Sequence, residues 1–481
     1  MLFNSIEFLI FFPLVTALYF LLPHRYRWVH LLIASCAFYM FFIPLYIVIL
    51  LGTIVIDYYA GILIEDTLDP IKRKRWLTLS IVANVGVLCI FKYYNFFTEN
   101  VNALFGYNVG EGIPYLDMIL PIGLSFHTFQ AMSYTIEVHR GNQKAERHMG
   151  IYALYVMFYP QLVAGPIERP QNMLHQFHEK HEFDYNRAVS GVKLMCWGMF
   201  KKLVIADRLA IMVDEVYNHP GAYEGYPVWI ATYLFSIQVF CDFSGYSDIA
   251  LGSARVMGFD LMKNFNRPYW ATSIAEFWRK WHISLNTWFV DYVYTPIVVN
   301  KRNWEKWAVV YAILITFSLS GLWHGAKWTF VIWGTLHGIA LSYDFLSKKM
   351  RKKWSKAIPS SIYKPLSLFL TFNFVSFTYI FFRANTVQDA FQLIASLGNL
   401  HLSQISLHPF GMSIGTMELI VAFVFIVVME IMHALQLKYG ENLPFITKAP
   451  MMVRWSLYCA AGLIIVLFGL MHTQSFIYFQ F

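Results

Sequence analysis

Three histidines stand where a polar side chain is costly to keep. His282 lies in FWRKWHIS, and His324 and His337 lie in GLWHGAKWTFVIWGTLHG, among tryptophans, glycines and apolar runs. Burying a polar group without a hydrogen bond costs about 2–7 kcal/mol, so an ionisable residue in an apolar membrane span is a hypothesis for a functional site. Packing, with a hydrogen bond to a backbone carbonyl, is the alternative for each histidine alone. For three of them beside Arg279 and Asp291, a functional site is the stronger interpretation.

The chemistry open to such histidines is proton transfer. A neutral imidazole has a pKa near ambient pH, which suits it to act as a general base. The sequence has no H-E-x-x-H motif, so we expect no metal, and no other bound cofactor is indicated. A Ser-His-Asp hydrolase is not indicated either, because no G-x-S-x-G elbow occurs. The five cysteines stand singly in apolar surroundings, as buried hydrophobic residues do.

The elements that must position these residues belong to a chain with the composition of a membrane protein. Of the 481 residues, 57% are hydrophobic, 18% aromatic and only 14% charged, whereas soluble domains carry about 25% charged residues. The net charge of +8 comes from short Lys and Arg clusters between apolar runs. Such clusters are typical of cytoplasmic loops and contacts with lipid headgroups, and they argue against a nucleic-acid partner. The apolar N-terminal run lacks a basic start and a cleavage site, so we expect a retained span.

The apolar runs predict an all-α, polytopic protein with about 11–13 spanning or re-entrant helices, because in lipid every backbone group must be satisfied within its segment. We expect one membrane-embedded domain over residues 1–481, with its core at 117–345. The expected spans are roughly 5–22, 29–42, 44–62, 77–95, 117–137, 150–165, 189–212, 227–251, 307–323, 327–345, 363–383, 415–436 and 453–472.

The basic loops predict how the chain is oriented. One cluster contains Arg25 and Arg27, another is KRKR at 72–75, and a third contains Arg140, Lys144 and Arg147. An N-terminus outside the cell places all three on the cytoplasmic side, as the positive-inside rule requires. The strongest basic loop, at 347–356, is expected there as well.

Three further stretches place polar groups inside apolar segments. His127, Thr128 and Gln130 lie in 121–134, a Glu168/Arg169 pair ends the proline-rich 158–170, and Asp242 and Asp248 lie in 240–252. Each alone has a structural explanation, such as a kink or a solvated pair. Together they favour a bundle with a polar, water-accessible interior.

Residues 266–296 are rich in Trp and Tyr, which settle at membrane interfaces, and predict an interfacial or re-entrant helix. Ser273 and Glu276 have the spacing of a capping box at its start. This helix would turn His282 toward the interior, with Arg279 and Lys280 toward phosphate or the headgroups.

If a helix that begins near Gly321 runs continuously through the last motif, His324 and His337 point about 140° apart on it and would not act as a pair. We expect His324 to be catalytic and His337 to be packed and hydrogen-bonded. The glycines of this helix lack bulk, so neighbouring backbones or a thin ligand chain can approach closely. They are Gly321, Gly325, Gly334 and Gly338.

The WRKWHIS and GLWHGAKWTFVIWGTLHG motifs together resemble the signature of the membrane-bound O-acyltransferase (MBOAT) family. The resemblance extends through SFHTFQAMSY, VAGPIERP and DFSGYSDIALGSARVMGFDLMKNFNRPYW to YIFFRA. It is nearest the branch that acetylates alginate and transfers D-alanine to teichoic acids. The family pattern implies helices that ring a thin centre, with funnels from both membrane faces meeting at a histidine. Its invariant histidine falls on His324, and its second position, a His or Asn, falls on His282.

The resemblance implies O-acetylation of an extracytoplasmic polysaccharide by a protein of the bacterial inner membrane. Acetyl-CoA or an acyl carrier would be the donor substrate from the cytosol, and a separate extracytoplasmic acetyltransferase would finish the transfer. The sequence departs from this branch at VVNKRNW, where a Gly-Gly pair is usual, and at Val290, where an Arg is frequent. The departure bears on the acceptor or partner more than on the chemistry. Beside the two histidines, we expect the substrate path to include Trp278, Arg279, Asn286, Asp291, Trp323, Trp328, Asp242 and Gln130.

Other functions stay open from the sequence. Within the family, the acceptor could be teichoic acid, a lipid or a protein, with an acyl or D-alanyl group transferred. In another class, a transporter or flippase would line its path with the same intramembrane polar groups, although no inverted repeat is visible. Consumption of labelled acetyl-CoA separates the enzyme from the transporter. Membrane lipids are expected to surround the protein in either case.

Overall fold

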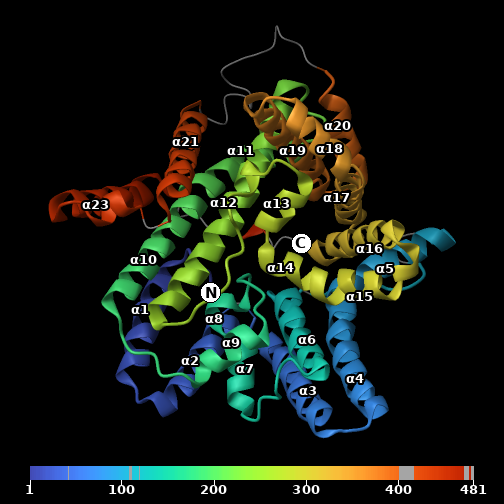
Figure 1. Ribbon diagram of the computed structural model, residues 1–481, viewed down its shortest axis with the longest axis vertical. Helices are drawn as coiled ribbons and strands as arrows, with labels where there is room; N and C mark the ends of the chain where they lie inside the picture. Colours follow the sequence, from blue (N-terminus) through green and yellow to red (C-terminus); the bar gives the residue numbers. More distant parts are fainter. Residues whose placement is uncertain are drawn as a thin grey trace. The chain divides into compact units, whose positions relative to one another are not determined.

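The computed structural model describes residues 1–41, 43–107, 111–118, 120–399, 416–441, 443–470 and 476–477. Within these ranges every regular element is a helix and no strand occurs, which confirms the all-α class (Figure 1). Contacts divide the chain into two compact units, one of residues 1–195 with 247–263 and the other of residues 196–246 with 264–481. The expectation of a single domain stays a prediction, because a single domain can itself contain two compact groups of helices.

The first unit is built from helices α1 to α9 and from parts of α10 and α12. Their bounds are α1 Ile6–Leu21, α2 His24–Met40, η1 Pro44–Tyr46, α3 Ile47–Asp66, α4 Pro70–Leu88, η2 Cys89–Tyr93, α5 Tyr94–Phe105, α6 Leu124–Arg140, α7 Met149–Met157, α8 Tyr159–Leu162, α9 Pro170–His178, α10 Tyr185–Met199 and α12 Tyr226–Met257.

The second unit holds the rest of α10 and α12 and all later elements. Their bounds are η3 Phe200–Ala206, α11 Asp207–Tyr217, η4 Pro268–Trp270, α13 Ile274–Lys280, α14 Ile283–Phe289, η5 Val290–Tyr294, α15 Thr295–Asn300, η6 Arg302–Trp304, α16 Lys306–His324, α17 Trp328–Leu346, α18 Lys348–Ala357, α19 Ser360–Arg383, α20 Val387–Ser396, α21 Thr416–Tyr439, α22 Pro444–Thr447 and α23 Met451–Phe468.

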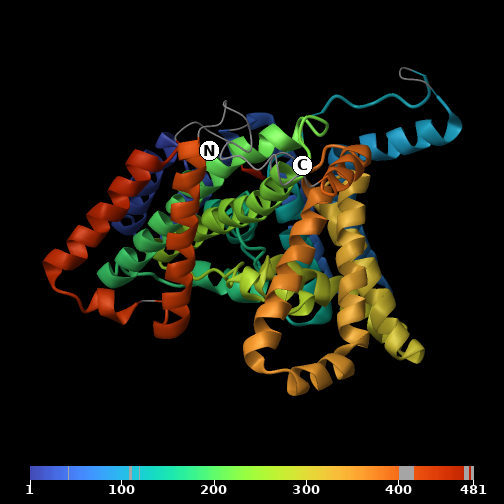
Figure 2. The same ribbon diagram turned by 90° about the horizontal axis from the view of Figure 1, so that it is seen from above.

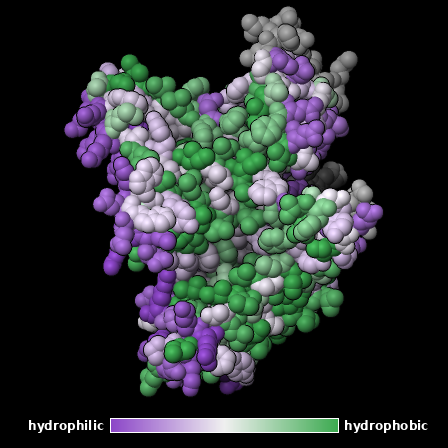
Figure 3. All heavy atoms as spheres, turned by 90° about the vertical axis from the view of Figure 1, so that its right-hand side faces the viewer, coloured by the Kyte–Doolittle hydropathy of each residue, from purple (hydrophilic) through white to green (hydrophobic). Residues whose placement is uncertain are grey.

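Seven helical stretches of the described chain are long and apolar enough to cross a membrane, by length and composition. They are Pro44–Asp66, Pro70–Phe105, Tyr226–Met257, Lys306–His324, Ser360–Arg383, Met417–Tyr439 and Met451–Phe468. Hydrophobic side chains cover broad areas of the face drawn in Figure 3, as lipid contact requires. The chain is therefore a multi-pass membrane protein.

The other expected spans are helical but shorter, more polar or interrupted. Helix α1 has 16 residues, the span expected at 117–137 becomes helical only from Leu124, and 150–165 is divided between α7 and α8. The span at 189–212 contains the π-helical η3, which is buried. Residues 42, 119, 415, 471 and 472 of the expected spans lie outside the described residues.

The three basic clusters of the N-terminal half lie at one end of the first unit. Arg147 donates to Asp66 at 2.9 and 2.7 Å, and Arg73 donates to the His139 carbonyl at 3.0 Å. The Trp28 ring, next to the cluster of Arg25 and Arg27, lies 4.6 Å from the His148 ring, next to Arg147, between ring centroids. The arrangement agrees with the sequence argument that these loops share one side of the membrane.

The helix does not run on continuously from Gly321, which was the condition for the separation of about 140° between His324 and His337. Helix α16 ends at His324, Gly325 takes an extended conformation with φ −161° and ψ 146°, and α17 begins at Trp328. The two helices form a closely packed hairpin instead. A Cβ on Gly321 would stand 2.2 Å from the Phe330 carbonyl oxygen, and one on Gly334 would stand 2.2 Å from the Phe317 carbonyl oxygen. The glycines thus let backbones approach, which is one of the two roles expected for them.

Candidate active site

His282 lies in a tight turn between α13 and α14. Its backbone has φ 42° and ψ 56°, the left-handed region that residues with a Cβ seldom occupy. Hydrogen bonds to a neighbouring extended segment hold the turn on both sides. The Asn266 N–H donates to the Lys280 carbonyl at 2.9 Å, and the Ile283 N–H donates to the Asn264 carbonyl at 3.0 Å. A strained backbone that surrounding hydrogen bonds hold in place is a feature of functional sites.

The helix that leads into this turn begins at a side-chain cap. The Ser273 hydroxyl accepts from the Glu276 N–H at 3.1 Å, which confirms the expected N-cap. The reciprocal bond of a capping box is replaced, because the Glu276 carboxylate accepts from the N–H and the hydroxyl of Thr272, each at 2.8 Å. Lys280 pairs with Glu276 at 2.6 Å.

His324 ends α16 directly beside the turn that carries His282. The ring centroids of the two histidines lie 6.4 Å apart, with 53° between the ring planes. Both side chains are buried, His282 completely and His324 to 2% exposure. Two histidines that are forty-two positions apart in the sequence are thereby brought into one site.

Aromatic rings enclose the histidine pair. The His324 ring contacts Trp323 and Trp333, each at a centroid distance of 5.0 Å, and Phe382 at 5.5 Å. The His282 ring meets the Phe243 ring edge-on at 4.6 Å. Aromatic walls exclude water and lower the local dielectric, so hydrogen bonds and charges inside act more strongly than in water.

Burial also fixes the protonation state of His282. Desolvation penalises the charged imidazolium and lowers the pKa of His282 from 6.5 to about 3. His282 is therefore neutral at physiological pH. A neutral imidazole has one N–H donor and one acceptor nitrogen, which suits it to hold a partner or a carbonyl group.

His337 is a packed, hydrogen-bonded residue, as expected. The Trp278 indole N–H donates to its Nδ1 at 3.2 Å, and its Nε2 lies 3.0 Å from the Thr378 hydroxyl. Its side chain is completely buried. The expectation that His324 and His337 do not share a substrate rested on a continuous helix, which does not form. The hydrogen bonds of His337 to residues other than His324 nevertheless agree with that expectation.

The remaining residues expected on the substrate path have diverse surroundings. Trp323 lies against both histidines, with its ring centroid 6.2 Å from that of His282. Trp278 is buried beneath His337, and the Asn286 amide donates to the Trp278 carbonyl at 2.9 Å, which ties α14 to α13. Three others are exposed at the surface of the second unit: Arg279, Asp291 and Trp328.

Asp242 and Gln130 have partners inside the protein. The Asp242 carboxylate pairs with Lys202 at 2.6 Å and accepts from the Ile477 N–H at 2.7 Å. Lys202 also pairs with Asp207 at 2.8 Å, so the three form a buried charged cluster in the second unit. Gln130 lies in the first unit and donates to the Tyr155 carbonyl at 2.5 Å. A place for either on the substrate path stays a prediction.

Two groups near the histidines were missed by the sequence argument. The Asn264 side-chain oxygen accepts from the Ser284 N–H at 3.2 Å, while its NH₂ group has no partner among the described residues. The Trp333 indole N–H is likewise buried without a partner in the described chain. Asn264 is bonded to the backbone of the two residues that follow His282, and the Trp333 ring lies 5.0 Å from the His324 ring between centroids. The sequence signal for Trp333 was its place nine residues after His324. A hairpin brings Trp333 back beside His324, whereas a continuous helix would carry it away.

Among the residues that the structure describes, no three His, Cys, Asp or Glu side chains are grouped closely enough to hold a metal ion. The site is an aromatic enclosure around two imidazoles, with the Trp333 indole beside His324.

Comparison with known proteins places this site in a family. Residues 123–382 match the family model of the membrane-bound O-acyltransferases. The probable alginate O-acetylase of Pseudomonas aeruginosa is 35% identical over 457 residues, which cover 94% of this chain and 84% of that protein. The peptidoglycan O-acetyltransferase of Helicobacter pylori is 34% identical over 398 residues, 77% of this chain and 73% of that protein.

A more distant relative is the teichoic acid D-alanyltransferase of Streptococcus thermophilus, 29% identical over 286 residues that cover 54% of this chain and 68% of that protein. The matched residues 123–382 contain both His282 and His324 and the helices that position them. With a family model matching more than half of its length and relatives above 30% identity over most of it, the chain belongs to the membrane-bound O-acyltransferase family and is an enzyme of acyl transfer.

Proposed function

We propose that the protein transfers an acetyl group from a cytosolic thioester, acetyl-CoA in the first instance, toward hydroxyl groups of an extracytoplasmic polysaccharide. The observation that carries the proposal is the His282–His324 pair, two buried imidazoles 6.4 Å apart in an aromatic enclosure. Relatives named for the O-acetylation of alginate and of peptidoglycan support the acyl group and the kind of acceptor.

In the proposed reaction, His324 acts as the general base. A neutral His324 takes the proton of the acceptor hydroxyl as its oxygen attacks the thioester carbonyl, and the carbonyl oxygen becomes an oxyanion. The C–S bond then breaks, the ester forms, and the imidazolium returns its proton to the departing thiolate. His324 thus ends the cycle neutral, with one thiol and one ester produced.

The oxyanion needs donors that are already in place, because preorganised hydrogen bonds are the largest electrostatic contribution to acyl transfer. Neutral His282 can donate one N–H to the oxyanion, or hold the thioester carbonyl, or orient His324. The Trp333 indole N–H is a second candidate donor, since its ring lies 5.0 Å from the His324 ring and its N–H has no partner in the described chain.

Delivery across the membrane completes the proposal. The donor would enter from the cytosol, and the acyl group would leave on the outer face of the inner membrane, where a partner acetyltransferase hands it to the polymer. A related possibility is D-alanyl transfer to teichoic acid, favoured by the Streptococcus thermophilus relative. The two possibilities differ in the acyl group and the acceptor but use the same pair of histidines.

The deciding experiment follows radiolabel from acetyl-CoA in membranes that contain wild type, His324→Ala or His433→Gln. His433 is a buried histidine beside Glu430 and serves as the matched control. We expect label in envelope polysaccharide or a partner protein with wild type and the control, and loss of at least about a hundredfold with His324→Ala. Equal label from all three would remove His324 from the chemistry. No label from any folded protein would direct the search to another acyl donor or to the transporter alternative.

A further inference from the structure

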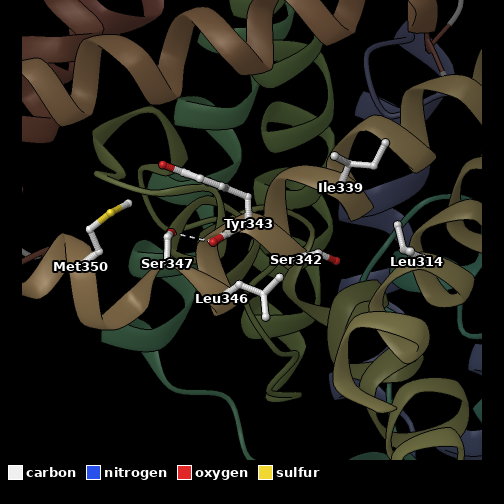
Figure 4. A pocket seen from close by; sticks show the side chains of 7 residues that line it. All are labelled: Leu314, Ile339, Ser342, Tyr343, Leu346, Ser347 and Met350. Atoms are coloured by element: carbon white, nitrogen blue, oxygen red, sulfur yellow. Dashed lines mark hydrogen bonds between the residues drawn. The ribbon is translucent and has the colours of Figure 1, made fainter. Parts of the chain in front are cut away.

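A groove opens on the outer face of the α16–α17 hairpin, at the end where α17 meets α18. Its volume is about 550 Å³, which is within the range of ligand pockets (Figure 4). Leu314 of α16, Ile339 and Leu346 of α17, and Met350 of α18 supply apolar side chains to it. Ile339 is 54% exposed and Leu346 47% exposed, so the groove is open to its surroundings.

Two of the three hydroxyl groups that line this groove already donate to backbone carbonyls. The Ser342 hydroxyl donates to the Gly338 carbonyl at 2.8 Å, and the Ser347 hydroxyl donates to the Tyr343 carbonyl at 2.6 Å. The second bond is the dashed line in Figure 4. Apart from the exposed Tyr343 hydroxyl, the lining therefore offers mainly methylene and methyl surface, and an apolar chain is the occupant that it suits.

Beside the groove lies a strongly basic helix. Helix α18, KKMRKKWSKA, connects the ends of α17 and α19 and contains six basic residues and no acidic one (Figure 2). Arg351 pairs with Asp344 at 3.1 Å. The five lysines are exposed, and none of them makes an ion pair within the described part of the chain: Lys348, Lys349, Lys352, Lys353 and Lys356.

The apolar residues of α18 share a side that the lysines leave free. Met350, which lines the groove, and Trp354 are four positions apart and so lie on one face of the helix. Trp is enriched where protein meets the lipid headgroups, and Trp354 is 45% exposed. A helix with an apolar face and a lysine-rich face is typical of the membrane surface.

We propose that this groove and α18 form a binding site for an anionic phospholipid of the bilayer, with an acyl chain in the groove and the phosphate on the α18 lysines. Charge complementarity selects the headgroup, because about 1 kcal/mol per lysine favours anionic lipid. The apolar lining selects a chain over a free phosphate. This proposal stands independently of the proposed acyl transfer, since it uses no residue of the histidine pair.

The groove is separate from the histidine pair. Leu314 precedes His324 by ten residues in the same helix, a rise of about 15 Å along its axis. His324 is 2% exposed, whereas Ile339, Leu346 and Met350 are open at the surface. A lipid in the groove would therefore lie along the outside of the hairpin, while the reacting groups remain inside.

The test measures binding of fluorescent phosphatidylglycerol and phosphatidylcholine to the purified full-length protein in detergent. One variant, K349Q/K352Q/K353Q, removes charge from α18. A second, Leu346→Trp, fills the groove and keeps the charge. The matched control is K72Q/K74Q/R75Q, which removes three basic groups from exposed positions of α4. Gel filtration confirms that each variant is folded.

We expect wild type and the α4 control to bind phosphatidylglycerol in preference to phosphatidylcholine. The α18 variant should lose affinity on the order of a hundredfold, and Leu346→Trp should lose at least about tenfold although its charge is unchanged. An equal loss with the α4 control would show general attraction and overturn the site. So would full binding by Leu346→Trp, or displacement of the lipid by coenzyme A, which would make the groove a donor site.

Discussion

His282 combines a strained backbone with a buried neutral ring, and the two properties can be separated by substitution. In a left-handed conformation Asn is tolerated and Gly is unstrained, whereas Ala is neither. We predict that His282→Ala lowers the rate of acyl transfer about 10²–10⁴-fold. His282→Asn should retain part of the rate, because its amide can still donate.

The control for strain is His282→Gly, which relieves the backbone and supplies no donor. It should melt no lower than His282→Ala and be as inactive. Full activity of the glycine variant would mean that the turn matters only for its shape, and that the imidazole takes no part in the chemistry.

Trp333 allows a test of the oxyanion proposal. Trp333→Phe keeps most of the aromatic wall beside His324 and removes the unpartnered indole N–H. If that N–H stabilises the oxyanion, the turnover number should fall about 10²–10³-fold with the substrate KM little changed. Trp281→Phe is the control, since Trp281 is also fully buried in the second unit. Equal rates for Trp333→Phe and wild type would remove this donor from the mechanism.

Glu168 provides a prediction for pH. The sequence left open a solvated pair with Arg169, but Glu168 is 1% exposed and accepts from the Met262 N–H at 2.5 Å. Burial raises the pKa of Glu168 from 4.5 to about 7. A carboxyl with a folded pKa above its unfolded one contributes stability fully below pH 4.5 and loses it as pH rises through 7. The protein should therefore melt at a higher temperature at pH 5.5 than at pH 8.

Glu168→Gln is the matched variant, because an amide keeps the acceptor oxygen and cannot ionise. It should flatten the dependence of melting temperature on pH between 5.5 and 8, and it should be the more stable protein at pH 8. An unchanged pH profile in the variant would assign the dependence to other groups.

At the scale of residues, the sequence pointed to the histidines by type and surroundings. It expected His337 to be packed and hydrogen-bonded, and the contacts of His337 with Trp278 and Thr378 agree with that. The catalytic role of His324 stays a prediction. Asn264 escaped notice since it lies in a polar stretch beside Lys263, Asn266 and Arg267, where an Asn carries no signal of its own. Its importance comes from hydrogen bonds to a turn about twenty positions later.

At the scale of elements, the α16–α17 hairpin depends on two glycines that face each other. A Cβ on Gly334 would meet the Phe317 carbonyl oxygen at 2.2 Å and the Gly321 Cα at 3.0 Å, and backbone cannot move aside as a side chain can. We predict that Gly334→Ala destabilises the protein by at least about 2 kcal/mol and displaces His324. The readouts are the fraction of monodisperse protein that remains after heating, and the rate of acyl transfer.

Gly462→Ala in α23 is the matched control, because a Cβ there would meet nothing within 4 Å. That variant should be as stable as wild type or more stable by up to about 1 kcal/mol, since alanine favours a helix. If Gly334→Ala behaved like Gly462→Ala, the hairpin would have to be looser than the described contacts indicate.

The break after His324 shows why element boundaries were harder to predict than elements. Apolar runs located α16 and α17 to within a few residues, but the local pattern across Gly325 also fits a continuous helix. The hairpin is decided by tertiary packing, in which Phe330 closes over Gly325. No periodicity in the sequence records that contact.

At the scale of the whole molecule, the charge pattern predicted which segments, far apart in the chain, lie on the same side of the membrane. Basic clusters far apart in the chain were expected on one side of the membrane, and in the first unit Arg147 reaches Asp66 while Arg73 reaches the His139 carbonyl. The positive-inside rule says that this side is cytoplasmic. The buried polar interior was harder to predict in detail, because Asp242 and Gln130 are satisfied by partners that sequence spacing does not reveal.

Sidedness can be measured by introducing single cysteines into a variant that lacks the five native ones. Lys72→Cys lies in the first turn of α4 and Lys144→Cys in the loop after α6, two segments that are joined within the first unit. Glu111→Cys lies beyond the other end of the 36-residue helical stretch Pro70–Phe105. In intact spheroplasts a membrane-impermeant maleimide should label Glu111→Cys alone. After permeabilisation it should label all three. Lys352→Cys on α18 should behave like Lys72→Cys, because both are in basic clusters. Different labelling of Lys72→Cys and Lys144→Cys would contradict the packing of the first unit, whereas labelling of both in intact spheroplasts would reverse the orientation and, with it, the face from which the acyl donor must enter.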